Sequence, residues 1–419
     1  MSGIEIRTYG CSMNRGASEA IAGILKQKGF LLKKGADILI INTCTVKTPT
    51  EHKILKELKA LQRNGGKVIV AGCLPAASPN VVELFPEFSF LGTNIEDVVK
   101  AIEETINGRR YVKIGRGAST LGAEKIRENQ VIGIVPISQG CLGACNYCLV
   151  KKARGDLVSF QRKDIVDEVK SAVSSGAKEI WLTSQDCGAY GIDRGENLAQ
   201  LISDVSNIDG DFMVRVGMSN PDHVKNILPE LIEAYKNEKV YKFLHIPVQS
   251  GDNKVLKDMN RFYSREEFVE VIKEFRREIP DITISTDIIA GYPTENDTAF
   301  KRTLSLLKEV QPDVLNISRF WARPGTPAEK LKQLPGRVTN QRSREAAALF
   351  KKISSDKNNK WVDWKGRALV SEIGKHKTYM ARNYAYKAIV LHSRENVLGQ
   401  FVNARVTASK GYYLEGEII

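Results

Sequence analysis

Three short apolar segments near the start of the chain each end on a cysteine. The segments are IEIRTYGC to Cys11, DILIINTC to Cys44 and KVIVAGC to Cys73, and stretches with helical periodicity such as SEAIAGILKQKGF and TEHKILKELKALQRN follow them. Repeated strand–helix units form a parallel sheet, and its strands end at one common edge. We therefore predict an open parallel α/β sheet over residues 1–112 that brings the three thiols together. The alternative is that they pack separately as small buried hydrophobes.

A second series of strand-like and helix-like segments fills residues 130–357, after a Gly-rich and charged connector at 113–129. Amphipathic segments such as RKDIVDEVKSAVSSGA alternate with six candidate strands, at 131–137, 179–186, 211–219, 243–250, 282–291 and 314–323. Six strands are too few to close the usual eight-stranded barrel, so we predict a partial (β/α)6 barrel that is open on one side. Functional side chains are expected at the C-terminal ends of its strands.

Residues 358–419 alternate apolar and polar side chains between short turns. The segments GRALVSEIG, YAYKAIVL, GQFVNARVTAS and GYYLEGEII predict a small antiparallel β-barrel, which makes the chain an α/β multidomain protein. This part has ten Lys and Arg against five Asp and Glu, in a chain with a net charge of +13. An RNA-binding appendage would use phosphate contacts and aromatic stacking. The candidates are Lys375, Lys377, Arg382 and Lys387, with Tyr384, Tyr386, Tyr412 and Tyr413 expected to be exposed. A stabilising barrel with a solvated basic face is the alternative.

The overall composition is that of a globular protein without a membrane span. Of 419 residues, 42% are hydrophobic and 26% are charged. No stretch approaches the roughly 18 apolar residues of a transmembrane helix, and MSGIEIRTYGC lacks the features of a signal peptide. We therefore expect a cytoplasmic protein. We also expect it to be a monomer. Because thiols stay reduced in the cytosol, the seven cysteines favour metal ligands or catalytic thiols over disulfides.

The segment GCLGACNYC places Cys141, Cys145 and Cys148 at C-x3-C-x2-C spacing after the first strand of the partial barrel. Three thiolates this close can cap one face of a 4Fe-4S cluster, and one iron then stays open for a small chelating ligand. Structural zinc is the alternative, but zinc requires four ligands and no fourth Cys or His lies close in the sequence.

This cysteine loop resembles that of the radical S-adenosylmethionine superfamily. Seven further motifs narrow the resemblance: TYGCSMNRGASE, INTCTVK, VAGCLP, WLTSQDCGAYG, FLHIPVQSGDNKVLKDMNRFYS, TDIIAGYPTE and FWARPGTPA. Together with GCLGACNYCLVKKARGDLVSF they are similar to the methylthiotransferases, and most similar to the archaeal and eukaryotic branch that modifies N6-threonylcarbamoyladenosine in tRNA. The order of domains matches too, from an N-terminal cluster domain through the radical-SAM barrel to a C-terminal TRAM barrel.

The resemblance implies a cofactor set and a reaction. Cys11, Cys44 and Cys73 would bind a second 4Fe-4S cluster, where sulfur is held and methylated, and S-adenosylmethionine would serve as methyl donor and as radical source. The product is a 2-methylthio group at position 37 in the tRNA anticodon stem-loop, on a base turned out of the loop. The adenine C2 hydrogen is not acidic, so we expect no catalytic acid or base. A separate low-potential electron donor of the ferredoxin or flavodoxin type is implied.

Further contacts to the cofactor follow from the ends of the barrel strands. The candidates are Tyr147, Thr183, Ser184, Gln185, Gln249, Ser250, Asp287 and Arg323. Arg154 and Arg261 are candidate anion binders, for the cofactor carboxylate or for tRNA phosphate. Cys187 is interpreted as a structural thiol, and His245 either as structural or as a residue that supports the site residues.

Three other functions stay open at this point. Related methylthiotransferases modify isopentenyladenosine in tRNA or an aspartate of a ribosomal protein. The segment KKARGDLVSF favours the threonylcarbamoyl branch, and the basic C-terminal barrel argues against the ribosomal substrate. A non-catalytic RNA-binding iron–sulfur protein would need only one of the two cysteine groups.

Overall fold

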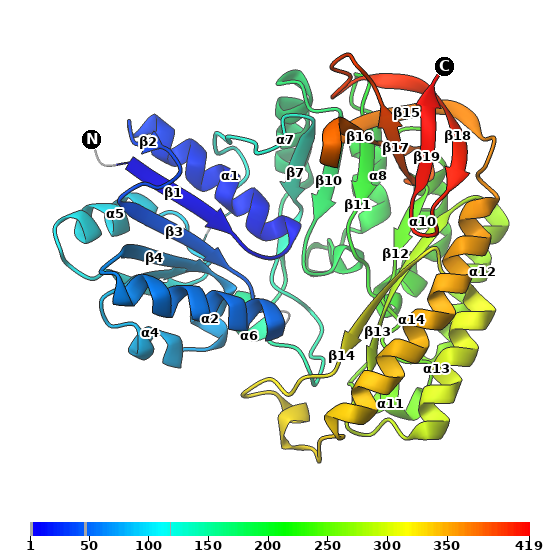
Figure 1. The fold of residues 1–419 in the computed structure, drawn as a ribbon, viewed down its shortest axis with the longest axis horizontal. Helices are drawn as coiled ribbons and strands as arrows, with labels where there is room; N and C mark the ends of the chain where they lie inside the picture. The colour runs from blue at the N-terminus through cyan, green and yellow to red at the C-terminus, as the bar shows by residue number, and fades with distance from the viewer. Residues whose placement is uncertain (1–2, 46–47, 118) are drawn as a thin grey trace.

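A computed structural model describes residues 3–45, 48–117 and 119–419, so Val46 and Lys47 of the INTCTVK motif lie outside it. The N-terminal part is a six-stranded parallel sheet in the order β2-β1-β3-β4-β5-β6, coloured blue to cyan in Figure 1. Its strands are β1 (Gly3–Thr8), β2 (Leu31–Leu32), β3 (Ile38–Thr43), β4 (Lys67–Gly72), β5 (Ser89–Gly92) and β6 (Val112–Gly115). Its helices are α1 (Ser12–Gln27), α2 (Thr48–Arg63), α3 (Cys73–Ala77), α4 (Asn80–Leu84) and α5 (Val98–Ile106).

Helices cover both faces of this sheet, which explains the continuous apolar runs of its central strands. Successive residues of β3 alternate between the two cores. Ile38 and Ile40 pack with α1 and α5, whereas Leu39 and Ile41 pack with α2. The predicted parallel sheet is confirmed, and β1, β3 and β4 are neighbours in it. The sheet also includes β6, so the boundary predicted at residue 112 falls at the start of its last strand.

The central part has the six predicted strands, in two parallel sheets ordered β11-β10-β7 and β12-β13-β14. They are β7 (Ile132–Pro136), β10 (Glu179–Thr183), β11 (Met213–Val216), β12 (Phe243–His245), β13 (Thr283–Ala290) and β14 (Val314–Arg319), with a small ribbon of β8 (Ser138–Gln139) and β9 (Val158–Ser159). A bridge between Val214 and Val240 joins the two sheets. Because the two outer strands, β7 and β14, do not pair, the barrel is open as predicted.

Helices surround these strands and bury one continuous core between helices and sheets. They are α6 (Val150–Arg154), α7 (Arg162–Ser174), α8 (Leu198–Ser206), α9 (Pro221–Val224), α10 (Leu228–Lys236), α11 (Asn253–Asp258), α12 (Arg265–Glu278), α13 (Asp297–Val310) and α14 (Gly336–Asn359). Among the described residues, no helix is both long enough and apolar enough to cross a membrane.

The C-terminal part is a closed five-stranded barrel in the order β15-β16-β17-β19-β18. Its strands are β15 (Lys365–Ile373), β16 (Thr378–Asn383), β17 (Ala388–His392), β18 (Phe401–Ser409) and β19 (Leu414–Ile418). The sequence prediction missed β16. It also extended β17 over residues 384–387, which form a turn with Tyr386 at a φ of 59°. All neighbouring pairs are antiparallel except β17 and β19.

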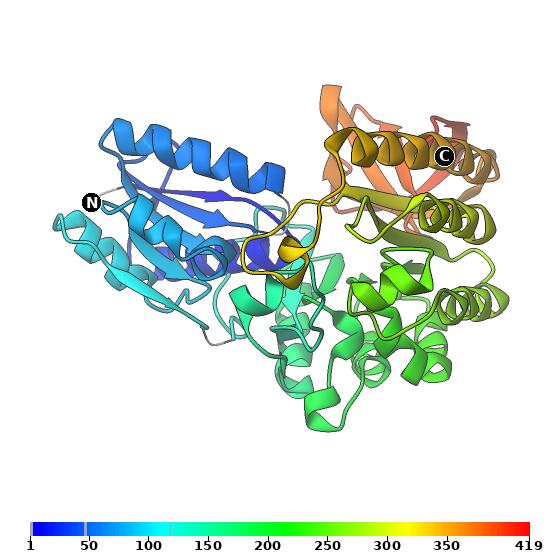
Figure 2. The ribbon, with the colours of Figure 1, turned by 90° about the horizontal axis from the view of Figure 1, so that it is seen from below.

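This barrel docks against the N-terminal ends of the central strands. Tyr386 donates a hydrogen bond of 2.9 Å to Glu179, the first residue of β10, and Lys387 donates one of 2.7 Å to Asp313, just before β14. The sites expected at the C-terminal strand ends therefore lie at the opposite edge. Figures 1 and 2 show the N-terminal sheet and the C-terminal barrel on different sides of the central part.

Candidate active site

The three N-terminal cysteines lie at the ends of neighbouring strands, as predicted: Cys44 and Cys73 directly follow theirs, and two residues separate Cys11 from its strand. Cys11 follows β1 and is exposed, while Cys44 after β3 and Cys73 after β4 are buried. Glycines let these loops approach one another: a Cβ at Gly10, where φ is +111°, would lie 2.9 Å from the Cys44 sulfur. At Gly72, where φ is +90°, a Cβ would lie 2.3 Å from the Thr43 carbonyl oxygen. Only glycine fits both backbone positions.

Asn14 connects the three cysteine loops, and the sequence analysis missed it. Its side-chain amide, fully buried in α1, donates hydrogen bonds of 2.8 Å to the carbonyls of Tyr9 and Thr43, which precede Cys11 and Cys44. Its Oδ1 lies 4.0 Å from the Cys73 sulfur. The signal available in the sequence was its place in the TYGCSMN segment, one helical turn after Cys11.

Arg154 reaches this cysteine site from the central part of the molecule. It is buried at the end of α6, and its Nε donates to the Cys73 sulfur at 3.2 Å while its Nη2 donates to Asn14 Oδ1 at 2.7 Å. Burial opposes its charge, but interactions with the three N-terminal cysteines hold the pKa of Arg154 above its usual value. Arg154 therefore faces sulfur, and the sequence-based expectation that it binds tRNA phosphate does not fit its burial.

Two further contacts fasten the N-terminal loops to the central barrel. The hydroxyls of Ser12 and Thr183 share a hydrogen bond of 2.5 Å. Arg323, which is buried, donates from Nη2 to the Thr45 carbonyl and hydroxyl oxygens, each at 2.6 Å, and to the Glu51 carboxylate. Thr183 and Arg323 are predicted cofactor contacts, but in the structure both bridge the two parts of the molecule. Each loop that carries an N-terminal cysteine is thus hydrogen-bonded to a barrel side chain.

The second cysteine group lies in the loop after β7 and β8. A Cβ at Gly143 would lie 3.6 Å from the Cys141 sulfur and 3.9 Å from the Cys145 sulfur, so both sulfurs face this glycine. Burial raises the pKa of Cys141 to about 11 and that of Cys148 to about 12. A thiolate here needs a strong cationic partner, which bound iron supplies. Among the described residues no three Cys, His, Asp or Glu lie close enough to share a single metal ion.

Arg261, the other predicted anion binder, lies beside this group. Its Nη1 donates to the Cys145 sulfur at 3.3 Å, and its Nη2 donates to Asn220 at 2.7 Å. Asn220 in turn donates its backbone N–H to Asp186, which binds His223 Nδ1 at 2.8 Å. Arg261 therefore has hydrogen-bonding partners within the protein, beside a predicted cluster ligand.

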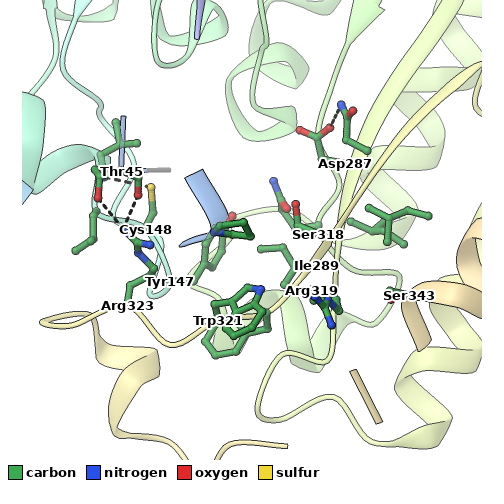
Figure 3. Close-up of a pocket in the computed structure, with 18 residues that line it drawn as sticks. Thr45, Tyr147, Cys148, Asp287, Ile289, Ser318, Arg319, Trp321, Arg323 and Ser343 are labelled. Atoms are coloured by element: carbon green, nitrogen blue, oxygen red, sulfur yellow. Dashed lines mark hydrogen bonds between the residues drawn. The ribbon is translucent and has the colours of Figure 1, made fainter. Parts of the chain in front are cut away.

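A cavity of about 590 Å³ opens beside Cys148 and is lined by β13 and β14 (Figure 3). Four predicted cofactor contacts line it: Tyr147, Gln249, Asp287 and Arg323. In Figure 3, Thr45, Cys148 and Arg323 lie together at one end, while Asp287 and Ser343 lie toward the other. Gln249 has a φ of 68°, which is uncommon outside glycine and often marks functional positions. Asn316, Ser318, Arg319 and Trp321 also line the cavity, and the sequence analysis did not single them out.

The other predicted cofactor contacts do not line this cavity. Ser250 is fully buried, and Ser184 accepts a hydrogen bond from the Asp186 backbone. Gln185 Oε1 is buried without a hydrogen-bond partner among the described residues, so an acceptor is left for a ligand donor. Asp287, by contrast, does line the cavity; it accepts a hydrogen bond from Asn316 at 2.6 Å and lies 3.3 Å from His245 Nε2. Cys187 is buried in the apolar core, in agreement with a structural thiol.

The predicted RNA contacts divide into two sets. Lys375 and Lys377 are exposed in the turn before β16. Arg382 and Lys387 are not exposed, because this side of the barrel packs on the central part. Tyr386 was wrongly predicted to be exposed, since its ring packs against Tyr241 and Phe243 with centroid distances of 4.7 and 4.9 Å. The other three tyrosines are exposed: Tyr384, Tyr412 and Tyr413.

Known families match all three parts of the chain. Residues 135–307 match the radical SAM superfamily, residues 3–91 match the uncharacterized protein family UPF0004, and residues 366–419 match the TRAM domain. A probable threonylcarbamoyladenosine tRNA methylthiotransferase of Pyrococcus horikoshii is 43% identical, with 99% of each chain covered. The threonylcarbamoyladenosine tRNA methylthiotransferase of Homo sapiens is 36% identical over 99% of this chain and 73% of its own length.

The chain belongs to the threonylcarbamoyladenosine tRNA methylthiotransferase family. The resemblance predicted from its motifs is thus confirmed, and the chain is a radical-SAM enzyme. Membership of the radical SAM superfamily implies S-adenosylmethionine and a 4Fe-4S cluster. The C-x3-C-x2-C thiols, with Cys148 lining a cavity of about 590 Å³, fit a 4Fe-4S cluster and S-adenosylmethionine.

Solved radical-SAM enzymes share the fold. The methyltransferase TsrM from Kitasatospora setae, solved with cobalamin and a 4Fe-4S cluster bound, has a TM-score of 0.57 at 13% identity, covering 78% of this chain and 77% of that chain. The cobalamin-dependent radical enzyme OxsB has a TM-score of 0.53 at 12% identity, covering 84% of this chain and 56% of that chain. At these identities the likeness concerns the fold alone.

Proposed function

We propose that this chain installs a 2-methylthio group on N6-threonylcarbamoyladenosine at position 37 of tRNA. The observation that carries the proposal is the full-length similarity to relatives of that name. The strand-end position of Cys11, Cys44 and Cys73 supports a second sulfur-rich site. Their loops contact the radical-SAM barrel through Thr183, Arg154 and Arg323, which supports a shared reaction space between the two cysteine groups.

In this proposal each cysteine group holds one 4Fe-4S cluster. Cys141, Cys145 and Cys148 hold the cluster that binds S-adenosylmethionine, and Cys11, Cys44 and Cys73 hold the cluster that carries the sulfur. When bound, these groups supply the radical activation and the methylthio donor that an unactivated C–H bond requires. Tyr147, Gln185, Gln249 and Asp287 orient the cofactor, and the inter-domain contacts keep the two clusters in a fixed relation.

The adenine enters the cavity after it is turned out of the anticodon loop. Trp321, which lines the cavity and is 45% exposed, offers a surface for stacking. Lys375 and Lys377 contact phosphates farther away on the TRAM barrel. The proposal includes a ferredoxin- or flavodoxin-type reductant, a cytoplasmic location, a monomer, and domain boundaries at 112, 129 and 357.

Anaerobic reconstitution tests the cofactors. The wild-type chain should bind about eight irons, and replacement of either cysteine trio by alanine should leave about four. S-adenosylmethionine cleavage after reduction should persist when the N-terminal trio is replaced. Iron that stays near zero, with zinc bound instead, would contradict the proposal.

Mass spectrometry of tRNA nucleosides tests the substrate. Cells that lack the gene should lose 2-methylthio-N6-threonylcarbamoyladenosine and regain it when the gene is restored. Loss of the methylthio derivative of isopentenyladenosine instead would assign the chain to the other tRNA substrate.

A further inference from the structure

The helix α6 links the two cysteine groups over a very short stretch of chain. It begins at Val150, two residues after Cys148, and ends at Arg154, whose guanidinium contacts Cys73. Leu149 and Ala153 pack against Cys73 and Ala77, so the contact between α6 and α3 is apolar. One rigid turn of helix thus carries a positive charge from the radical-SAM loop into the N-terminal cysteine site.

Burial strengthens the electrostatic interaction between the Arg154 guanidinium and the N-terminal cysteines. The residue is 7% exposed, and its two hydrogen-bond partners, the Cys73 sulfur and Asn14 Oδ1, are buried as well. An arginine stays protonated at this depth, and Coulomb interactions are stronger there than at a surface. All three N-terminal cysteines interact electrostatically with this guanidinium. A cluster held by three thiolates, with an additional anionic sulfur, would place its negative charge next to Arg154.

A second barrel arginine that crosses the interface, Arg323, offers a comparison. Arg323 is equally buried and also contacts the loop after a cysteine, but there it donates to oxygen atoms, those of Thr45 and Glu51. Arg323 therefore fastens the domains through oxygen acceptors, whereas Arg154 donates directly to a cysteine sulfur. The reduction potential of an iron–sulfur cluster depends on its net charge, on hydrogen bonds to its sulfurs and on solvent exposure.

We propose that Arg154 is a positioning residue of the N-terminal cluster, and that its charge and its N–H···S bond to Cys73 raise the reduction potential of that cluster. This inference rests on the proposed second cluster. Cys11, Cys44 and Cys73 all belong to the N-terminal part. Arg154, which contacts Cys73, belongs to the radical-SAM part. The sulfur-carrying cluster is then completed by docking of the two domains.

The test uses the full chain with Cys141, Cys145 and Cys148 replaced by alanine, so that only the N-terminal cluster can form. In this parent we compare Arg154→Gln, Arg154→Lys and the control Arg342→Gln by iron content and by a redox titration monitored by electron paramagnetic resonance. Arg342 is a suitable control because it is as buried as Arg154 but pairs with Glu295 and Asp297 inside the central part. We expect about four irons in the parent. Arg154→Gln should shift the potential to a more negative value, Arg154→Lys should shift it less, and Arg342→Gln should leave it unchanged.

The possible results separate this inference from the proposed function. If the parent binds no iron, the second cluster is wrong and the inference falls with it. If the parent binds iron but both Arg154 variants keep its potential, or Arg342→Gln shifts it equally, only the inference is overturned. If Arg154→Gln fails to retain iron, Arg154→Lys decides: a negative shift supports the inference, and an unchanged potential overturns it.

Discussion

Single buried polar residues organise both cysteine groups. Asn14 joins the loops of the N-terminal group through its amide, and Arg261 joins the Cys145 sulfur to Asn220. A buried polar side chain is stable only when its hydrogen bonds are satisfied, so each of these residues fixes several loops at once. Behind Arg261, Asp186 and His223 form a buried pair with a 2.8 Å contact.

The Asp186–His223 pair predicts a pH-dependent stability. Burial alone would lower the pKa of His223, but the hydrogen bond and the charge of Asp186 outweigh it and raise that pKa above 6.5. The folded chain then binds the proton more tightly than the unfolded chain. This stabilisation is complete below about pH 6.5 and is lost as the pH rises through the raised pKa. It amounts to about 1.4 kcal/mol for each pH unit that separates the folded from the unfolded pKa.

The measurement is the urea midpoint of the metal-free chain against pH. In the wild type, loss of the His223 proton should lower the midpoint as the pH rises above about 6.5. In His223→Gln, which cannot titrate, this part of the decrease should be absent. His392→Gln is the control, since His392 is exposed. Parallel curves for wild type and His223→Gln would contradict the assignment.

At the level of whole elements, the strand ends and one short helix determine where the chemistry lies. β1, β3 and β4 end side by side and each leads into a cysteine, while β13 and β14 line the cavity. The loops at these ends are held across the domain interface by Ser12 with Thr183, by Arg154 with Cys73, and by Arg323 with Glu51.

The pair Arg323–Glu51 should be important for docking of the N-terminal sheet. In Glu51→Gln the guanidinium loses its charged partner in a buried position, which typically costs about 3–5 kcal/mol. We expect trypsin to cleave the connector at 113–129 faster in Glu51→Gln than in the wild type. Gel electrophoresis of samples taken over time measures the cleavage rate. Glu309→Gln is the control, because its pair with Arg265 lies at the surface and surface pairs contribute about 0–1 kcal/mol. Equal cleavage rates in the two variants would rule out this role.

At the scale of the whole molecule, the TRAM barrel and the cavity lie at opposite edges of the central sheets. The barrel uses Tyr386 and Lys387 to dock, and it leaves Lys375 and Lys377 exposed. An RNA that reaches both places has to extend along the side of the molecule. The positive charge that is available to RNA is therefore smaller than the composition of residues 358–419 indicates.

Lys375→Ala with Lys377→Ala should weaken tRNA binding and make it less sensitive to salt. Each lost phosphate contact reduces the magnitude of the slope of log K against log salt by about 0.7 for a single strand and about 0.9 for a duplex, so the double variant should lose about 1.4–1.8. Filter binding over a range of KCl concentrations measures this slope. The control is Arg405→Ala with Lys410→Ala, because both residues already pair with carboxylates. A slope equal to that of the wild type would exclude the turn at Lys375–Lys377 as an RNA contact.

Local patterns in the sequence were sufficient to predict most of the strands and the grouping of the cysteines. The apolar periodicity predicted the parallel sheet and all six central strands, because burial on a strand or a helix face repeats with the period of the element itself. The spacing of Cys141, Cys145 and Cys148 predicted a shared site, since a short loop cannot separate them widely. The strand ends likewise predicted that Cys11, Cys44 and Cys73 come together, because parallel strands end at one edge.

Tertiary structure alone decided the partners of the long polar side chains. Nothing in the sequence around Arg154 or Arg323 indicates that one donates to Cys73 and the other to Thr45, since these pairs are 81 and 278 residues apart. For the same reason Lys387 and Tyr386 were interpreted as surface residues, although docking of their barrel packs both against the central part. Periodicity reports which face of an element is buried, whereas a hydrogen bond across an interface depends on how separately folded parts are placed in space.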